Sequence, residues 1–329
     1  MTIRTATHAG SWYEGSKLRL SKQLDRLLSA VGTAHPEYPL SGARVLVGPH
    51  AGYAYAGPTL AETYKVWDTS KVKRVFIMGP SHYMYFKGFM ITGFSEFETP
   101  LGNIPVDVDC IAKLKTSGLF GTFPSDADEE EHGIEMHLPF LYKATEASEN
   151  GVPKIVPIVV GSCSKSDEKK LGKVLAEYFK DEENSFIVST DFCHWGKRFS
   201  YRAYTEMEDA SVIAELGLGY KLSPDSTPIY KSIEYLDRKG MAVLSTGSTK
   251  AWNNYIEDTD NTICGRKPLS VLLHTIENLS DTRMVQNGFT DTAQRSSWGK
   301  LQWIGYAQSS KAKTISDSSV SYASGYAIA

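Results

Sequence analysis

Short runs of apolar, often β-branched residues alternate along most of the chain with longer segments whose apolar positions have helical spacing. Such an alternation is typical of strands buried on both faces and joined by helices. The strand-like runs are Arg44–Val47, Arg74–Met78, Lys154–Val160, Ser185–Ser189, Leu301–Ala307 and Val320–Ile328. The segments with helical spacing are Leu18–Leu28, Asp167–Phe179, Tyr230–Leu244 and Leu269–Leu279. The pattern predicts an α/β fold with a central, mainly parallel sheet flanked by helices.

The domain organisation follows from the absence of an obvious linker. No stretch rich in proline, glycine and serine and no block of charge divides the 329 residues, and α/β domains of this length fold as one unit. We therefore expect a single domain over residues 1–329. Two polar segments without periodicity, 216–228 and 281–299, are expected to be surface insertions.

Composition limits the partners and the compartment. The formal net charge is -3 and no basic stripe is present, which argues against nucleic acid and favours a small molecule or peptide ligand. The sequence contains neither a signal peptide nor an apolar stretch long enough for membrane insertion. Four cysteines without short paired spacing are typical of a reducing compartment. We expect a cytoplasmic protein, with entry into the nucleus left open.

Two histidines follow strand-like runs in matching contexts. His50 comes after Gly48-Pro49, and His82 comes after Gly79-Pro80-Ser81. The carboxyl ends of parallel strands meet at one edge of a sheet, where reactive groups gather. Two imidazoles presented there suit a divalent transition metal. The alternative is that each is an ordinary loop histidine held by hydrogen bonds.

Asp191 and His194 lie three residues apart after another strand-like run. A carboxylate beside an imidazole can fix its tautomer and raise its basicity, so the two residues are candidates for a catalytic acid/base pair. Alternatively, Asp191 caps the next element and His194 packs against Trp195.

Cys264 precedes Gly265 and Arg266 near the start of a predicted helix. Helix amides and a guanidinium favour the thiolate, which is the form that binds metal or attacks carbon. A buried, inert cysteine is the alternative. Arg266 is a candidate for holding a carboxylate or phosphate through its planar fork.

Further histidines and a glutamate are candidates for the surroundings of the site. His132 and His137 are five residues apart with Glu135 between them, which does not match the zinc-protease pattern. We interpret His132, Glu135 and His137 as residues beside the metal ligands or on the substrate side. His8 is expected at the rim.

Seven motifs, in this order, are similar to those of the Memo family from about residue 7 to the C-terminus. They are Thr7–Tyr13, Pro49–Tyr53, Gly79–His82, Glu131–Pro139, Ser189–Gly196, Asn261–Arg266 and Asp317–Ala323. That family is similar in fold to the class III extradiol dioxygenases, which are non-haem iron enzymes. The resemblance implies the same fold for this chain.

The resemblance also implies roles for individual residues. His50 and His82 match the two histidine ligands of those enzymes, Cys264 falls where their carboxylate ligand is expected, and His194 matches the catalytic histidine, with Asp191 beside it. A thiolate in place of a carboxylate shifts the preference toward copper(I), zinc or thiolate-ligated iron. The implied cofactor is therefore a single transition metal, iron or copper, with zinc as an alternative.

Three functions remain open at this stage. The first is a metal-dependent redox protein with an implied role in metal homeostasis or in signalling for cell motility and growth, acting with signalling proteins. The second is a non-catalytic scaffold whose cleft binds a peptide or an anion. The third is a hydrolase with Cys264 as nucleophile, His194 as base and Asp191 as orienting group. Dioxygenase activity does not follow from the resemblance, and whether the chain is an enzyme is left open.

Overall fold

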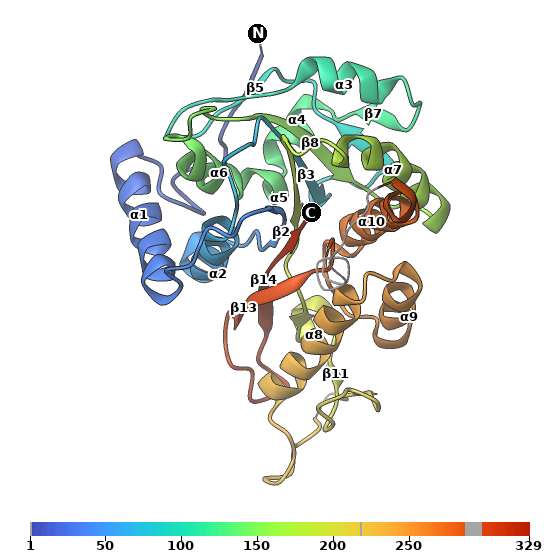
Figure 1. The fold of residues 1–329 in the computed structure, drawn as a ribbon. Helices are drawn as coiled ribbons and strands as arrows, with labels where there is room; N and C mark the ends of the chain where they lie inside the picture. Colours follow the sequence, from blue (N-terminus) through green and yellow to red (C-terminus); the bar gives the residue numbers. More distant parts are fainter. Residues whose placement is uncertain (1, 218, 287–297) are drawn as a thin grey trace.

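The computed structural model describes residues 2–217, 219–286 and 298–329, and at its centre is a nine-stranded sheet (Figure 1). The strand order is β10-β14-β2-β9-β3-β8-β4-β7, and β13 pairs with β14. The four inner strands β2, β9, β3 and β8 are parallel, and β14 and β4 flank them in antiparallel orientation. The predicted fold class, α/β with a mainly parallel sheet, is confirmed.

Six strands of this sheet match the predicted runs, and three short strands lie outside them. The strands of the sheet are β2 (Ala43–Gly48), β3 (Arg74–Pro80), β4 (Phe89–Ile91), β7 (Phe120–Thr122), β8 (Lys154–Val160), β9 (Asn184–Ser189), β10 (His194–Trp195), β13 (Gln302–Gln308) and β14 (Ser319–Ile328). Short strands outside it are β1 (Ile3–Arg4), β5 (Glu96–Phe97), β6 (Ile104–Pro105), β11 (Ala203–Tyr204) and β12 (Ala214–Glu215).

Helices cover both faces of the sheet. They are α1 (Lys17–Ala34), α2 (Tyr53–Lys65), α3 (Val108–Lys115), α4 (Ser125–Glu130), α5 (His132–Glu135), α6 (Leu138–Thr145), α7 (Lys165–Phe179), the 3-10 helix η1 (Lys197–Phe199), α8 (Ile229–Ser245), α9 (Thr249–Thr259) and α10 (Arg266–Gln286). On one face α7 and α10 pack together against β9; on the other, α2 contacts β2 and β14 and is backed by α1 and α6 (Figure 1).

Burial explains why the inner strands form. Every residue of β2 and β9 is buried, and so are six of the seven residues of β3. Strands enclosed on both faces favour continuous runs of Val, Ile, Leu and Phe, which is what the sequence contains. The helix α7 begins with a capping box between Ser164 and Asp167, which satisfies amides of its first turn. The predicted strands and helices are confirmed.

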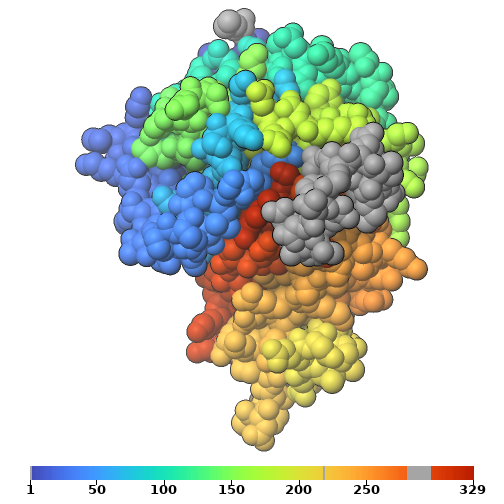
Figure 2. All heavy atoms as spheres, in the orientation of Figure 1, coloured from blue at the N-terminus to red at the C-terminus, as the bar shows by residue number. Residues whose placement is uncertain are grey.

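The two predicted insertions have different outcomes. Residues 219–228 form neither helix nor strand, and with the β11–β12 hairpin they project from the lower end of the molecule, in yellow (Figure 2). The helix α10 continues to Gln286, so the prediction of a loop from residue 281 is wrong for its first six residues. Residues 287–297 lie outside the described part of the chain.

None of the helices in the described ranges is long and apolar enough to cross a membrane.

Candidate metal centre

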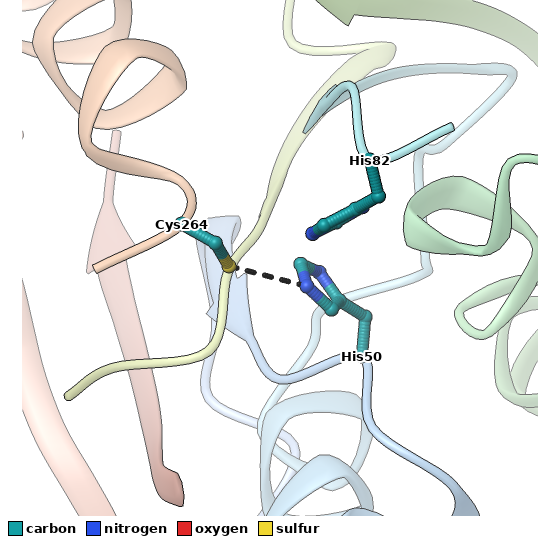
Figure 3. A group of neighbouring side chains, drawn as sticks. All are labelled: His50, His82 and Cys264. Atoms are coloured by element: carbon teal, nitrogen blue, oxygen red, sulfur yellow. Dashed lines mark hydrogen bonds between the residues drawn. The ribbon is translucent and has the colours of Figure 1, made fainter. Parts of the chain in front are cut away.

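His50, His82 and Cys264 come together at the carboxyl edge of the parallel strands (Figure 3). His50 follows β2, His82 follows β3, and Cys264 lies two residues before the start of α10. One ligand atom from each of the three residues lies within 4.8 Å of the others. The Cys264 Sγ lies 3.2 Å from His50 Nε2. Residues that are 214 positions apart in the chain thus form one group that could hold a metal ion.

Ser189, the last residue of β9, orients the His50 ring. His50 Nδ1 lies 2.7 Å from Ser189 Oγ, and the Ser189 hydroxyl donates its proton to the carbonyl of Gly133. A hydroxyl has one proton, so Ser189 Oγ accepts from the Nδ1–H of His50. The lone pair of Nε2 therefore faces Cys264. Burial and the neighbouring His82 and His132 hold the pKa of His50 well below its usual range, so the ring is neutral, as a metal ligand must be.

Glu131 orients the His82 ring in the same way. His82 Nδ1 lies 2.8 Å from Glu131 Oε1, and the Glu131 carboxylate also accepts from the backbone amides of His82, Tyr83 and Gly133. Burial opposes ionisation of Glu131, but the bonds with His82 outweigh it and lower its pKa. An ionised carboxylate only accepts, so Nδ1 carries the proton. The opposite edge of the ring points toward Cys264 and His50 (Figure 3).

The charge balance at His82 has a consequence for metal uptake. Burial disfavours the charged ring, yet the contacts with Cys264 and Glu131 raise the pKa of His82 to about 10. A metal ion held at this position would replace the positive charge that the sulfur and the carboxylate favour, and its binding would release the ring proton on the side of Cys264.

The donor set fits a transition metal. Histidine ligands in metal sites are held by a hydrogen bond from the other ring nitrogen to an oxygen, and both His50 and His82 have such a bond. Two imidazole nitrogens and one sulfur suit copper(I), zinc and iron better than the hard cations magnesium or calcium. The structure therefore brings the three predicted ligand residues together, with the His50 and His82 rings each held through Nδ1.

The predicted Asp191–His194 pair does not form. The buried Asp191 carboxylate accepts from the His50 backbone amide at 2.9 Å, and the Asp191 amide approaches Cys264 Sγ at 3.1 Å. His194 Nδ1 meets the Phe192 carbonyl at 2.9 Å. In the described residues no hydrogen bond joins the two side chains, because the loop after β9 turns Asp191 toward β2 while β10 pairs with β14. Burial raises the pKa of Asp191 to about 7.

Among the predicted surrounding residues, His132 lies at the site. Its ring stacks on His82 with centroids 4.2 Å apart and meets His50 edge-on at 5.4 Å. The same ring, with His82 and Glu131, forms a second group with metal-ligand geometry. Burial and the nearby His82 lower the pKa of His132 to about 4. His8 is one step further out, with its ring centroid 5.9 Å from that of His132.

Glu135 and His137 serve the framework. Glu135 is buried and accepts from Arg4 at 2.7 Å, Tyr13 at 2.8 Å and His8 at 2.9 Å, so it anchors the N-terminal loop that carries His8. His137 is buried behind the site with Nδ1 3.0 Å from Tyr64 Oη. Glu135 and His137 do not belong to either group with metal-ligand geometry that the described residues contain.

Arg266 lies at the opening next to the sulfur. A cavity of about 280 Å³ is lined by Cys264 and Arg266 together with Ser81, Met84, Tyr85 and Lys267. Lys267 is engaged by the buried Glu168 at 2.6 Å, whereas Arg266 is exposed and its guanidinium has no hydrogen-bond or ion-pair partner within the described ranges. The cavity thus connects Cys264 with solvent past a free cation.

Sequence reasoning missed the two residues that orient the rings. Glu131 directly precedes His132 and falls within a family motif, and Ser189 ends the strand before Asp191. The signal in the sequence was an oxygen-bearing side chain near a candidate site residue in each case. The fold decides which histidine ring that side chain contacts.

A mainly parallel α/β sheet covered by helices on both faces, with a His-His-Cys group at its carboxyl edge, defines a class of protein, and comparison with known proteins identifies the family. A family described as Memo-like protein matches residues 4–326. The chain belongs to the Memo family. It is 42% identical to the MEMO1 family protein MHO1 of Saccharomyces cerevisiae, covering 99% of each chain. It is 38% identical to protein MEMO1 of Homo sapiens and 39% identical to that of Danio rerio, in both cases over 99% of this chain and 97% of the relative.

Proposed function

We propose that this chain is a metal-binding protein in which His50, His82 and Cys264 hold a single transition metal ion, iron or copper, with zinc fitting the same donors. The observation that carries the proposal is the matched orientation of the two rings. Ser189 and Glu131 each occupy one nitrogen of a ring, and the other nitrogen faces the same sulfur. A cluster of histidines with only a packing role would not require this arrangement.

The metal would supply one-electron redox chemistry or Lewis acidity next to the cavity. The residues around it divide the remaining tasks. Asp191 holds the backbone of His50 and donates its own amide toward Cys264, which fixes the two donors relative to each other. His194, half-buried nearby, is the candidate for proton transfer. The role that follows, in accord with the resemblance to Memo proteins, is redox control or metal homeostasis linked to growth and motility signalling in the cytoplasm or nucleus.

A second function is favoured by one observation, the free guanidinium of Arg266 in the cavity. A peptide or small molecule with a carboxylate or phosphate would be held there, and the protein would then serve as a scaffold. This function predicts that partner binding survives removal of the metal and is lost in Arg266→Ala.

The geometry does not favour the hydrolase hypothesis, because His194 is not placed as a base for Cys264. Cys264 Sγ is in contact with His50 Nε2, whereas His194 Nδ1 is bound to the Phe192 carbonyl and Asp191 is directed at the His50 backbone. The order nucleophile, base and orienting carboxylate that this chemistry needs is not present in these three side chains.

Metal content tests the main proposal. Protein purified without chelators or a metal-binding tag is compared with His50→Ala and Cys264→Ser, using inductively coupled plasma mass spectrometry. Cys163→Ser is the matched control, because Cys163 is also half-buried but lies beside Glu168. Near-stoichiometric iron, copper or zinc in the wild type and the control, lost in both test variants, is expected. Equal metal content in all four proteins, or no binding on anaerobic reconstitution, would overturn the proposal.

A further inference from the structure

Two loops carry Asp191, His194 and Cys264, and hydrogen bonds from side chains join the two loops. Gly265 N donates to Thr190 Oγ1 at 2.9 Å. Thr262 Oγ1 accepts from the amide of His194 and donates to its carbonyl, each at 2.8 Å. The loop after β9 and the loop before α10 are therefore bonded directly to each other, and the pair needs an anchor in the body of the protein.

Asp237 on α8 anchors both loops. Its Oδ1 accepts from the Cys193 backbone amide and from Asn261 Nδ2, each at 3.2 Å. Cys193 is the neighbour of His194 in the first loop, and Asn261 begins the second loop, three residues before Cys264. One carboxylate oxygen thus holds both loops at once.

The other oxygen faces the sheet rather than the loops. Asp237 Oδ2 accepts from Tyr306 Oη on β13 at 2.9 Å. The Tyr306 hydroxyl also contacts Ser321 Oγ on β14 at 3.2 Å, and the Ser321 amide donates to the Cys193 carbonyl at 2.9 Å. Oδ2 therefore joins α8 to the edge of the sheet, and the backbone bond between Ser321 and Cys193 holds the loop after β9 to β14 without the Tyr306 hydroxyl.

Burial of the Asp237 carboxylate costs free energy that its hydrogen bonds must offset. Its side chain is fully buried, and in the part of the chain that the structure describes it forms no ion pair with Lys, Arg or His. A buried carboxylate without a cation is stabilised only by its hydrogen-bond donors. Here the donors to Oδ1 come from the two loops themselves, so the carboxylate is satisfied only when both loops are in place.

We propose that Asp237 is a positioning residue for the metal centre, which fixes the joined loops that carry Asp191, His194 and Cys264 to α8. The inference rests on the proposed metal site, and it names a residue that does not touch the metal ligands. Loss of Oδ1 would release Asn261 and Cys193 and let Cys264 move away from His50 and His82.

Cobalt(II) titration of the full-length protein tests this role, because a thiolate-to-cobalt charge-transfer band reports directly on the sulfur ligand. Asp237→Ala removes the acceptor for both loops. Asp237→Asn keeps an oxygen for them, since its amide can face Tyr306. Tyr306→Phe is the matched control, because it removes a bond to the same carboxylate on the side away from the loops. Unfolding in denaturant is measured for each variant.

Asp237→Ala is expected to bind cobalt about tenfold more weakly with a diminished charge-transfer band, Asp237→Asn to recover most of the affinity, and Tyr306→Phe to bind as the wild type does despite lower stability. Wild-type binding by Asp237→Ala, or equal weakening by Tyr306→Phe, would overturn the proposal. Should Asp237→Ala not fold, Asn261→Ala cuts the link to the Cys264 loop alone and is expected to weaken binding similarly.

A metal-free measurement separates this inference from the proposed function. If the wild type binds no cobalt, the proposed metal site is contradicted. The positioning role is then tested by the rate at which iodoacetamide alkylates Cys264, followed by peptide mass spectrometry. Faster alkylation in Asp237→Ala than in both the wild type and Tyr306→Phe supports it. Equal rates in the three proteins contradict it.

Discussion

Replacing Glu131 by glutamine is expected to weaken both the fold and the metal site, for a reason that follows from its four donors. The amides of His82 and Tyr83 bond to Oε2, while His82 Nδ1 and the Gly133 amide bond to Oε1. Glutamine has one acceptor oxygen, so two of the four donors lose their acceptor whichever way the amide is placed. A buried donor without a partner costs about 1–3 kcal/mol. Two such donors would cost roughly 2–6 kcal/mol at full burial. Because His82 and Tyr83 are partly open to solvent, the free energy of unfolding is expected to fall by roughly 2–4 kcal/mol.

The same substitution acts on metal affinity through His82. Loss of the carboxylate frees the ring to rotate and removes the charge that makes it a better ligand, and such changes weaken metal binding by about 10–100-fold. Competition with a chromophoric chelator measures this, with urea unfolding of the metal-free protein alongside. Glu135→Gln is the control, because Glu135 is equally buried four residues further along, at the end of α5, but bonds to Arg4, His8 and Tyr13. The reasoning is refuted if Glu131→Gln binds metal as tightly as the wild type, or if Glu135→Gln weakens binding as much.

Three further predictions follow from the geometry. Ser189→Ala removes the acceptor for the Nδ1–H of His50 and is expected to lower metal affinity about tenfold in the same chelator competition, and unchanged affinity would contradict the assigned tautomer. Gly265→Ala places a methyl group 2.3 Å from Thr190 Cβ and is expected to lower the thermal midpoint and displace the sulfur, seen as a lost cobalt charge-transfer band; a wild-type midpoint would refute the close packing. Burial lowers the pKa of His137 to about 3, so its neutral form contributes stability above pH 6.5 that is lost as the pH falls toward 3. In His137→Gln, the slope of the unfolding free energy against pH between 6.5 and 4.5 is expected to decrease by up to about 1.4 kcal/mol per pH unit. An unchanged slope would contradict this assignment.

The strands and two of the three candidate ligands could be predicted because their causes are local. β2 and β3 are continuous apolar runs that lead into Gly48-Pro49 and Gly79-Pro80, and His50 and His82 follow within two residues at one edge of the sheet. The third ligand, Cys264, had no comparable local pattern. Its place beside the histidines came from the resemblance to the Memo family, and its 3.2 Å contact with His50 accords with that placement.

The contacts that the sequence did not indicate are those between distant segments. Glu131 meets His82 across 49 residues and Ser189 meets His50 across 139, and nothing near either pair in the chain specifies the partner. The expected hydrogen bond between Asp191 and His194 is absent from the described residues for the opposite reason. Their closeness in sequence suggested contact, but the backbone between them changes direction where β10 pairs with β14.

X-ray absorption spectroscopy of the zinc-loaded protein tests the central claim most directly, because it counts sulfur and nitrogen ligands separately. The account predicts one sulfur scatterer at about 2.3 Å and imidazole nitrogens at about 2.0 Å, with the sulfur absent in Cys264→Ser and one imidazole fewer in His82→Ala. A wild-type spectrum with only nitrogen and oxygen scatterers, or a sulfur that persists in Cys264→Ser, would contradict a metal centre built from His50, His82 and Cys264.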